Sequence, residues 1–203
     1  MCQFFEKSFV ETLRIEGSEI HNLIYHNERM NRTRRELFGS SDLLDLSDYI
    51  CPESYTERTK CRVVYAKEII KVEYAAYHMR SVRTLTLLER DTADYRYKST
   101  DRTLLNDLFA CKGDADDVLL IRHGLLTDTT ICNIALWNGE EWLTPAAPLL
   151  QGTMRASLLD RGTIREHTLC ANDLKNYTRI RLFNALIDFG EVEIALPKGI
   201  LNI

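Results

Sequence analysis

The sequence of 203 residues has no apolar run approaching the roughly 18 to 20 residues that a membrane-spanning helix needs. Its start, Met1 to Lys7, lacks the basic region and the apolar region of a signal peptide. The six cysteines are scattered and form no CxxC pair, which favours free thiols in a reducing compartment over a disulfide framework. These absences predict a soluble, cytoplasmic protein with no membrane partner.

Several well-known functional motifs are also missing. There is no GxSxG elbow, no P-loop and no GxGxxG, so neither a hydrolase triad nor a dinucleotide site is supported. The five histidines show neither HExxH nor Cys/His spacing, so no metal site is predicted. The net charge of −4 argues against nucleic acid as the main partner, because nucleic-acid-binding domains usually carry a basic excess.

What remains is typical of a globular protein with helices and strands. Apolar residues alternate with others over residues 9–15, which predicts a half-buried strand. Further strands are predicted over 62–65, 69–78 and 82–88 as an antiparallel meander, over 117–121, over 131–137 and 141–144 around the turn Asn138-Gly139, and over 179–187 and 192–196. Helices are predicted over 26–38, 41–49, 103–110 and 152–159, and 180–186 is compatible with either a strand or a helix. The mixture indicates the α+β class, with the polar stretch 90–97 separating lobes of residues 1–90 and 91–203.

Four segments have residue types that suit a binding or catalytic site. Residues 27–36 are rich in arginine, which is typical of a solvated helix face, of a surface for RNA or another acidic partner, or of one inward-turned arginine that holds a phosphate. Gly152 and Thr153 at a helix start form either a generic anion site or a cap. Lys98 and Asp128, taken singly, read as a surface lysine and a turn carboxylate.

The order and spacing of these segments resemble the class IV aminotransferases, the fold type IV enzymes that use pyridoxal phosphate. The similar segments are FVETLR at 9–14, matching the family's FET-x-R strand; HNERM at 26–30, matching H-x-x-R-L; Lys98, at the position of the Schiff-base lysine; 124–133, matching G-x-[VI]-T-E-x(4)-N; and 144–155, matching TP followed by L-x-G-[IT]-[TM]-R. Each segment is weak alone, but the combination is specific and runs through almost the whole chain.

The resemblance implies a two-lobed fold, with a small N-terminal α/β lobe and a C-terminal pseudo-barrel lobe, and a homodimer. It also implies a cofactor site in which Arg29 binds the phosphate, Lys98 carries the cofactor, Asp128 pairs with the ring nitrogen and Leu150 packs on the ring. Gly152, Thr153 and Met154 would add backbone amides to the phosphate site.

Within the family, three segments are most like those of the 4-amino-4-deoxychorismate lyases. They are KSTDR at 98–102, GTMR at 152–155 and NAL at 184–186. This implies a folate-pathway lyase that eliminates pyruvate from 4-amino-4-deoxychorismate to give 4-aminobenzoate, with Lys98 as the general base. The substrate-binding residues implied or suggested are Asn184, for a carboxylate, and Arg14, Tyr97 and Arg102.

Two departures from the family pattern keep other functions open. Asp128 stands where the family has glutamate, and the FET strand begins close to residue 1, whereas family members usually have a longer segment with a Gly-Asp-Gly loop before it. The alternatives are a pyridoxal-phosphate-dependent transaminase of branched-chain or D-amino acids, and a weakly active homologue that binds the cofactor.

Overall fold

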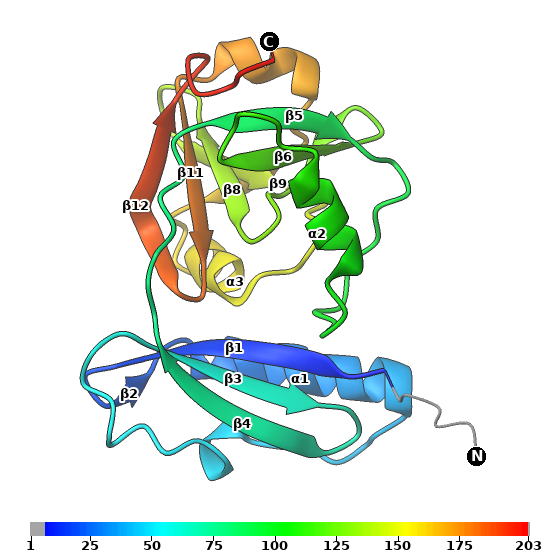
Figure 1. Ribbon diagram of the computed structural model, residues 1–203, viewed down its shortest axis with the longest axis vertical. Helices are drawn as coiled ribbons and strands as arrows, with labels where there is room; N and C mark the ends of the chain where they lie inside the picture. Colours follow the sequence, from blue (N-terminus) through cyan, green and yellow to red (C-terminus); the bar gives the residue numbers. More distant parts are fainter. Residues whose placement is uncertain (1–6, 203) are drawn as a thin grey trace. The chain divides into compact units, whose positions relative to one another are not determined.

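The computed structural model describes residues 7–202, so most of the segment on which a signal peptide was excluded lies outside the described residues. The chain divides into two compact units, and neither is continuous in sequence. Unit 1 consists of Met1–His78 and Tyr97–Asp101, and unit 2 of Met79–Arg96 and Arg102–Ile203. The predicted lobes 1–90 and 91–203 therefore assign 79–90 and 97–101 differently. Both units combine helices and strands, which confirms the α+β class (Figure 1).

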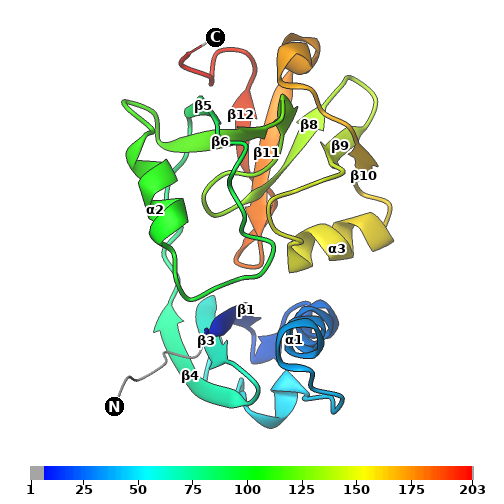
Figure 2. The ribbon, with the colours of Figure 1, turned by 90° about the vertical axis from the view of Figure 1, so that its right-hand side faces the viewer.

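Unit 1 is an antiparallel sheet of four strands with one long helix packed on one face (Figures 1 and 2). The strand order is β2-β1-β3-β4. The elements are β1 (Phe9–Glu16), β2 (Glu19–Ile20), α1 (Leu23–Phe38), β3 (Thr59–Tyr65) and β4 (Ile69–Ala76). The helix ends at Gly39, as predicted, because this residue has a φ of 65° and its N–H closes the last turn onto Arg35.

The alternation of β1 places one row of side chains in the core of unit 1. Phe9, Leu13 and Ile15 belong to this row and to the main apolar cluster. Glu11 lies in the same row and is also completely buried. The prediction of a half-buried strand is too modest, because Val10 and Arg14 on the opposite face are buried as well.

The predicted helix over 41–49 is wrong, and only one 3-10 turn, η1 (Leu46–Asp48), forms there. Side chains of α1 satisfy the backbone of this segment instead. Arg34 donates to the carbonyl oxygen of Asp42, and Asn31 binds both the N–H and the carbonyl of Leu44. Because the backbone groups already have partners, the segment gains little from becoming a helix.

Unit 2 contains two sheets and two helices (Figure 2). One sheet has the order β10-β9-β8-β11-β12 and the other β5-β6-β7. The elements are β5 (Leu85–Glu89), α2 (Thr103–Ala110), β6 (Asp117–Arg122), β7 (Leu125–Leu126), β8 (Asn133–Trp137), β9 (Trp142–Pro145), α3 (Thr153–Asp160), β10 (Arg165–His167), η2 (Ala171–Asn176), β11 (Arg179–Asn184) and β12 (Ile187–Ala195). Helix α2 packs beside β6 and α3 beside β11.

Most of the elements predicted in this part of the chain are confirmed. The hairpin around Asn138-Gly139 pairs Trp137 with Trp142, and β11 and β12 form a second hairpin, so the helical alternative for 180–186 is wrong. The meander is correct for β3 and β4 but wrong for its third strand. β5 instead pairs in parallel with β6 in unit 2. The prediction missed this pairing because parallel strands need a long connection, and no local turn sequence marks it.

Candidate active site

A buried cluster of three polar side chains lies in unit 1. Glu11 projects from β1, and His26 and Arg29 project from one face of α1, because residues three apart are neighbours on a helix. Nε and Nη2 of Arg29 donate to the two carboxylate oxygens of Glu11 at 2.9 and 2.5 Å. Nδ1 of His26 lies 2.6 Å from Oε2 of Glu11. The carboxylate thus fixes the guanidinium plane and the imidazole ring together.

The charge states of this cluster follow from burial and pairing. Burial alone would raise the pKa of Glu11, but the charge of Arg29 and hydrogen bonds from His26 and Arg29 outweigh it and lower the pKa to about 2. Burial is the largest effect on His26 and lowers its pKa, so the imidazole is neutral and donates its Nδ1–H to the carboxylate. The cluster therefore contains one carboxylate, one guanidinium and one neutral ring.

Lys98 is half-buried and also belongs to unit 1. Its carbonyl oxygen accepts the N–H of Val10 at 2.9 Å, and Ser99 pairs with Phe9, so the lysine segment lies against the start of β1. The charge of Lys98 is one of the influences that lower the pKa of His26. Lys98 therefore lies close enough to the Glu11–His26–Arg29 cluster to interact with it electrostatically.

In unit 2, Asp128 is buried, and its carboxylate accepts hydrogen bonds from a side chain and from the backbone. Nδ2 of Asn133 donates to Oδ1 at 2.9 Å, and the N–H of Leu150 donates to Oδ2 at 2.8 Å. Nδ2 of Asn133 also donates to the carbonyl oxygen of Leu150 at 2.9 Å. Asn133 therefore joins the loop that carries Asp128 to the segment that leads into α3.

The pKa of Asp128 is raised to about 6, and burial is the main cause. The hydrogen bonds from Asn133 and Leu150 and the charge of Arg155 oppose the rise without cancelling it. A buried carboxylate with this pKa is suited to pair with a cationic group, since such a partner would stabilise the ionised form and lower the pKa again.

Gly152 lies directly before α3, in close contact with the same asparagine. A Cβ atom at this position would be 1.8 Å from Oδ1 of Asn133, so only glycine fits. Thr153 and Met154 are the first two residues of α3, and both are buried. The first N–H groups of a helix have no acceptor within that helix, which suits the position to an anion.

The four predicted substrate residues have partners within the protein. Arg14 pairs with Glu16, and the Tyr97 hydroxyl lies 2.9 Å from Oε2 of Glu36. The remaining two contact the loop that follows Asp128: Arg102 donates to the carbonyl oxygen of Thr130 at 3.3 Å and Asn184 to that of Ile131 at 3.1 Å.

Of the predicted residues, unit 1 contains Arg14, Arg29, Tyr97 and Lys98, and unit 2 contains Arg102, Asp128, Leu150, Gly152, Thr153, Met154 and Asn184. The structure brings Arg29 and Lys98 to one cluster, and Asp128, Leu150 and Gly152 to another. Glu11, His26 and Asn133 were not predicted as site residues. A glutamate in the apolar row of β1 was the available signal for Glu11.

The family assignment follows from comparison with known proteins. The model of the amino-transferase class IV family matches residues 53–194. The chain belongs to the class IV aminotransferase family. An uncharacterized protein of Haemophilus influenzae is 35% identical over 181 residues, which cover 87% of this chain and 96% of that protein.

Solved structures of other proteins have the same fold. A Haemophilus somnus protein provisionally named a 4-amino-4-deoxychorismate lyase is 31% identical, with a TM-score of 0.83 and coverage of 92% of this chain and 98% of that one. A hypothetical aminotransferase of Mycobacterium tuberculosis in its pyridoxal-phosphate-bound form is 16% identical, with a TM-score of 0.76 over 93% of this chain and 81% of that one. The fold type IV architecture is thereby confirmed, and the enzymes of this family depend on pyridoxal phosphate.

Residues 7–202 contain neither a metal-binding cluster nor a helix that could span a membrane. No three His, Cys, Asp or Glu side chains gather there as a metal site. None of the helices in the described part of the chain is both long and apolar enough to cross a membrane. The surface stripe of arginines considered for an acidic partner is reduced, because Arg29 and Arg34 are buried.

Proposed function

We propose that the protein is a pyridoxal-phosphate-dependent lyase that eliminates pyruvate from 4-amino-4-deoxychorismate and yields 4-aminobenzoate for folate biosynthesis. The observation that carries the cofactor part is the buried carboxylate of Asp128, which Asn133 and Leu150 hold in place and whose pKa is raised to about 6, so that it suits a protonated ring nitrogen. The similarity to the Haemophilus somnus protein and the segments KSTDR, GTMR and NAL favour the lyase over a transaminase.

The chemistry of the proposed residues suits pyridoxal phosphate. In this proposal Asp128 pairs with the protonated ring nitrogen, and Leu150, whose N–H already binds Asp128, packs against the ring. The phosphate is bound by Arg29 and by the backbone at Thr153 and Met154. Glu11 takes two of the five N–H donors of Arg29, which fixes the orientation in which the guanidinium meets the phosphate.

Lys98 is the proposed catalytic residue. When bound, pyridoxal phosphate supplies an electron sink for the bond-breaking step. The Lys98 amine acts as general base and removes the proton from the substrate carbon that bears the amino group. The neighbouring carbon–oxygen bond then breaks, the enolpyruvyl group leaves and gains a proton to become pyruvate, and the ring of the product becomes aromatic.

The substrate has two carboxylates, and arginine is the natural partner for such groups. We therefore assign substrate contacts to Arg14 and Arg102, with Tyr97 and Asn184 as further contacts. Asn184 would have to release a partner, because its amide nitrogen donates to Ile131 and Cys132 and its oxygen accepts the N–H of Leu186. By family resemblance we also expect the protein to be cytoplasmic and to form a homodimer. Light scattering would check the oligomeric state.

The decisive experiment combines an absorption spectrum with product analysis. Wild-type protein given pyridoxal phosphate should show a visible band that Lys98→Ala abolishes and that Lys71→Ala, at an exposed lysine on β4, leaves intact. Addition of 4-amino-4-deoxychorismate should release pyruvate and 4-aminobenzoate in equal amounts. A band without pyruvate, together with conversion of amino acids to keto acids, would identify a transaminase instead, and no band at all would refute cofactor use.

A further inference from the structure

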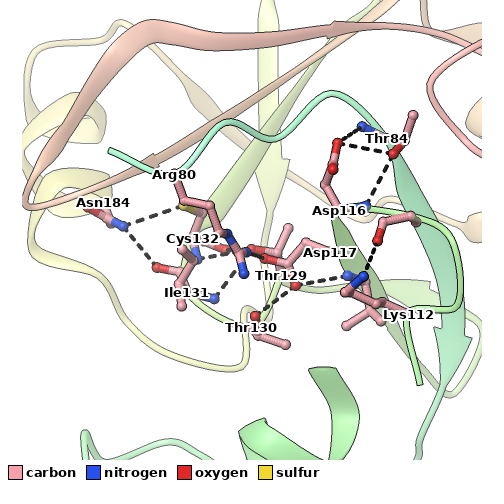
Figure 3. Close-up of polar contacts among 12 residues, drawn as sticks. Arg80, Thr84, Lys112, Asp116, Asp117, Thr129, Thr130, Ile131, Cys132 and Asn184 are labelled. Atoms are coloured by element: carbon pink, nitrogen blue, oxygen red, sulfur yellow. Dashed lines mark hydrogen bonds and ion pairs between the residues drawn. The ribbon is translucent and has the colours of Figure 1, made fainter. Parts of the chain in front are cut away.

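Two adjacent carboxylates at the start of β6 hold two different segments of unit 2 (Figure 3). Asp116 accepts the N–H groups of Arg83 and Thr84, at 2.8 and 3.0 Å, and the Thr84 hydroxyl. Asp117 points the other way, toward Thr130 and Arg80. One carboxylate therefore fixes the segment that leads into β5, and the other reaches the loop that follows Asp128.

The Asp117 carboxylate is almost completely buried, and both of its oxygens have partners. Oδ1 accepts the Thr130 hydroxyl at 2.7 Å and the N–H of Val118 at 2.9 Å. Oδ2 lies 2.5 Å from Nη2 of Arg80, whose side chain is 40% exposed and stacks on the Phe109 ring of α2. Burying a carboxylate is costly unless it is paired and hydrogen-bonded. Here the partly exposed Arg80 neutralises the charge of Asp117, while the other carboxylate oxygen accepts the hydroxyl of the buried Thr130.

Asp128 and Thr130 lie in the same short loop, between β7 and β8. Within it, Thr129 closes a tight turn: its N–H donates to the carbonyl of Cys132, and its hydroxyl accepts the N–H of Cys132. The carbonyl of Asp128 accepts the N–H of Leu120 on β6, the strand that begins at Asp117. The Asp128 backbone and the Thr130 side chain, which are two residues apart in sequence, are therefore both anchored to β6.

From this geometry we infer that Asp117, acting through Thr130 and neutralised by Arg80, is a positioning residue for Asp128. The inference rests on the proposed function, because it concerns the carboxylate assigned to the cofactor ring nitrogen. A carboxylate in contact with a cofactor must be held to within a fraction of an ångström, and neighbouring residues that lock it are part of the site. Asp116 has a different role, since its carboxylate accepts hydrogen bonds from Arg83 and Thr84 in the segment that leads into β5.

The chain offers matched variants for a test. Thr130→Val keeps the shape of the side chain and removes the hydroxyl, whereas Thr130→Ser keeps the hydroxyl. Asp116→Asn is the control for general loss of stability in the same region. Arg80→Gln removes the neutralising charge at a partly exposed position and serves if Thr130→Val does not fold. Each protein is examined without cofactor by amide hydrogen exchange, and by titration with pyridoxal phosphate from pH 5 to 8.

The expected result is a selective effect of the Thr130 hydroxyl. Thr130→Val should speed hydrogen exchange of the amides of Leu120 and Cys132. It should also weaken pyridoxal phosphate binding by about tenfold, which is the size expected for the loss of a hydrogen bond to a charged group. The pH midpoint of binding should move as well. Arg80→Gln should change the same quantities in the same direction. Thr130→Ser should restore wild-type values, and Asp116→Asn should lower the melting temperature without moving the midpoint.

Two results would overturn the inference. The first is that Thr130→Val has the same hydrogen exchange, the same affinity for pyridoxal phosphate and the same pH midpoint of binding as the wild type. If Thr130→Val does not fold, the same result in Arg80→Gln would overturn the inference. The other is an equal midpoint shift in Asp116→Asn. If the wild-type protein binds no pyridoxal phosphate, the proposed function fails, but hydrogen exchange still decides whether Asp117 holds the loop through Thr130.

Discussion

The side-chain amide of Asn133 occupies the space that a Cβ atom on Gly152 would need. The two residues are far apart in sequence, yet a Cβ at 152 would be 1.8 Å from Oδ1 of Asn133. Asn133 cannot retreat without cost, because its Nδ2 binds both Asp128 and the carbonyl of Leu150. The absence of a side chain at 152 is therefore a condition for the hydrogen bonds at Asp128.

Replacing Gly152 by alanine should displace Asn133 and release one donor from Asp128. We expect pyridoxal phosphate to bind at least about tenfold more weakly, since a buried charged group loses a hydrogen bond worth on the order of 1.5–3 kcal/mol. Titration of the apoprotein with cofactor measures this. In an Asn133→Ala background the same substitution should cost little, because the clash is gone. Equal losses in both backgrounds would show that the effect does not pass through Asn133.

Cofactor affinity should depend on pH through Asp128. Because burial raises the pKa of this carboxyl to about 6, it is ionised above pH 6 and protonated below it in the apoprotein. Pairing with a protonated ring nitrogen favours the ionised form, so affinity should be full above pH 6 and fall by up to about tenfold per pH unit below it. Binding isotherms from pH 5 to 8 test this. Asp128→Asn should bind weakly and lack that component, and an unchanged profile in this variant would assign the pH dependence elsewhere.

Removing the charge of Glu11 should destabilise unit 1. Glu11→Gln leaves Arg29 buried without its counterion, which typically costs about 3–5 kcal/mol. Chemical denaturation at pH 7 measures this, with Glu28→Gln at an exposed position of α1 as the control. Because the pKa of Glu11 is lowered from 4.5 to about 2, its contribution is present above pH 4.5 and is lost as the pH falls toward 2. The stability difference between wild type and Glu11→Gln should shrink over that range.

Truncation of two neighbouring arginines of α1 should change the stability by very different amounts. Arg34 is completely buried and donates to the carbonyl oxygens of Lys67 and Asp42 and to the Asp42 carboxylate, whereas Arg35 is exposed. Arg34→Ala should lower the free energy of unfolding by about 2–4 kcal/mol, because a buried side chain and its several hydrogen bonds are lost. Arg35→Ala should change it by less than about 0.5 kcal/mol. Thermal melts of the two variants compare them directly, and similar losses would contradict the structural role of Arg34.

Sequence patterns predicted those elements whose signals are local. The Asn138-Gly139 hairpin, the stop of α1 at Gly39 and the helix over 103–110 each depend on nearby residues, and each is found. The helix over 41–49 failed because side chains of α1 capture that backbone, and β5 was placed in the wrong sheet because its partner β6 comes after α2. Such long-range pairings have no counterpart in a short stretch of sequence.

The candidate site divides in the same manner. Arg29, Lys98, Asp128 and Gly152 could be named because they fall in recognisable segments. Nothing local indicated that Asn133 would fill the space beside Gly152, or that Asp117 would reach Thr130, because these contacts depend on how β6, β8 and the start of α3 come together. The residues that hold a site are therefore harder to predict than those that form it.

The discontinuous course of unit 1 has a consequence for how this chain is made. The short segment that carries Lys98, Tyr97–Asp101, belongs to unit 1, but it is synthesised only after the first part of unit 2, Met79–Arg96. A nascent polypeptide that has reached residue 78 contains every named strand and helix of unit 1 and still lacks Lys98. During translation, the segment that carries the proposed catalytic lysine is therefore the last part of unit 1 to be made, and it must return to a unit whose other elements are already synthesised.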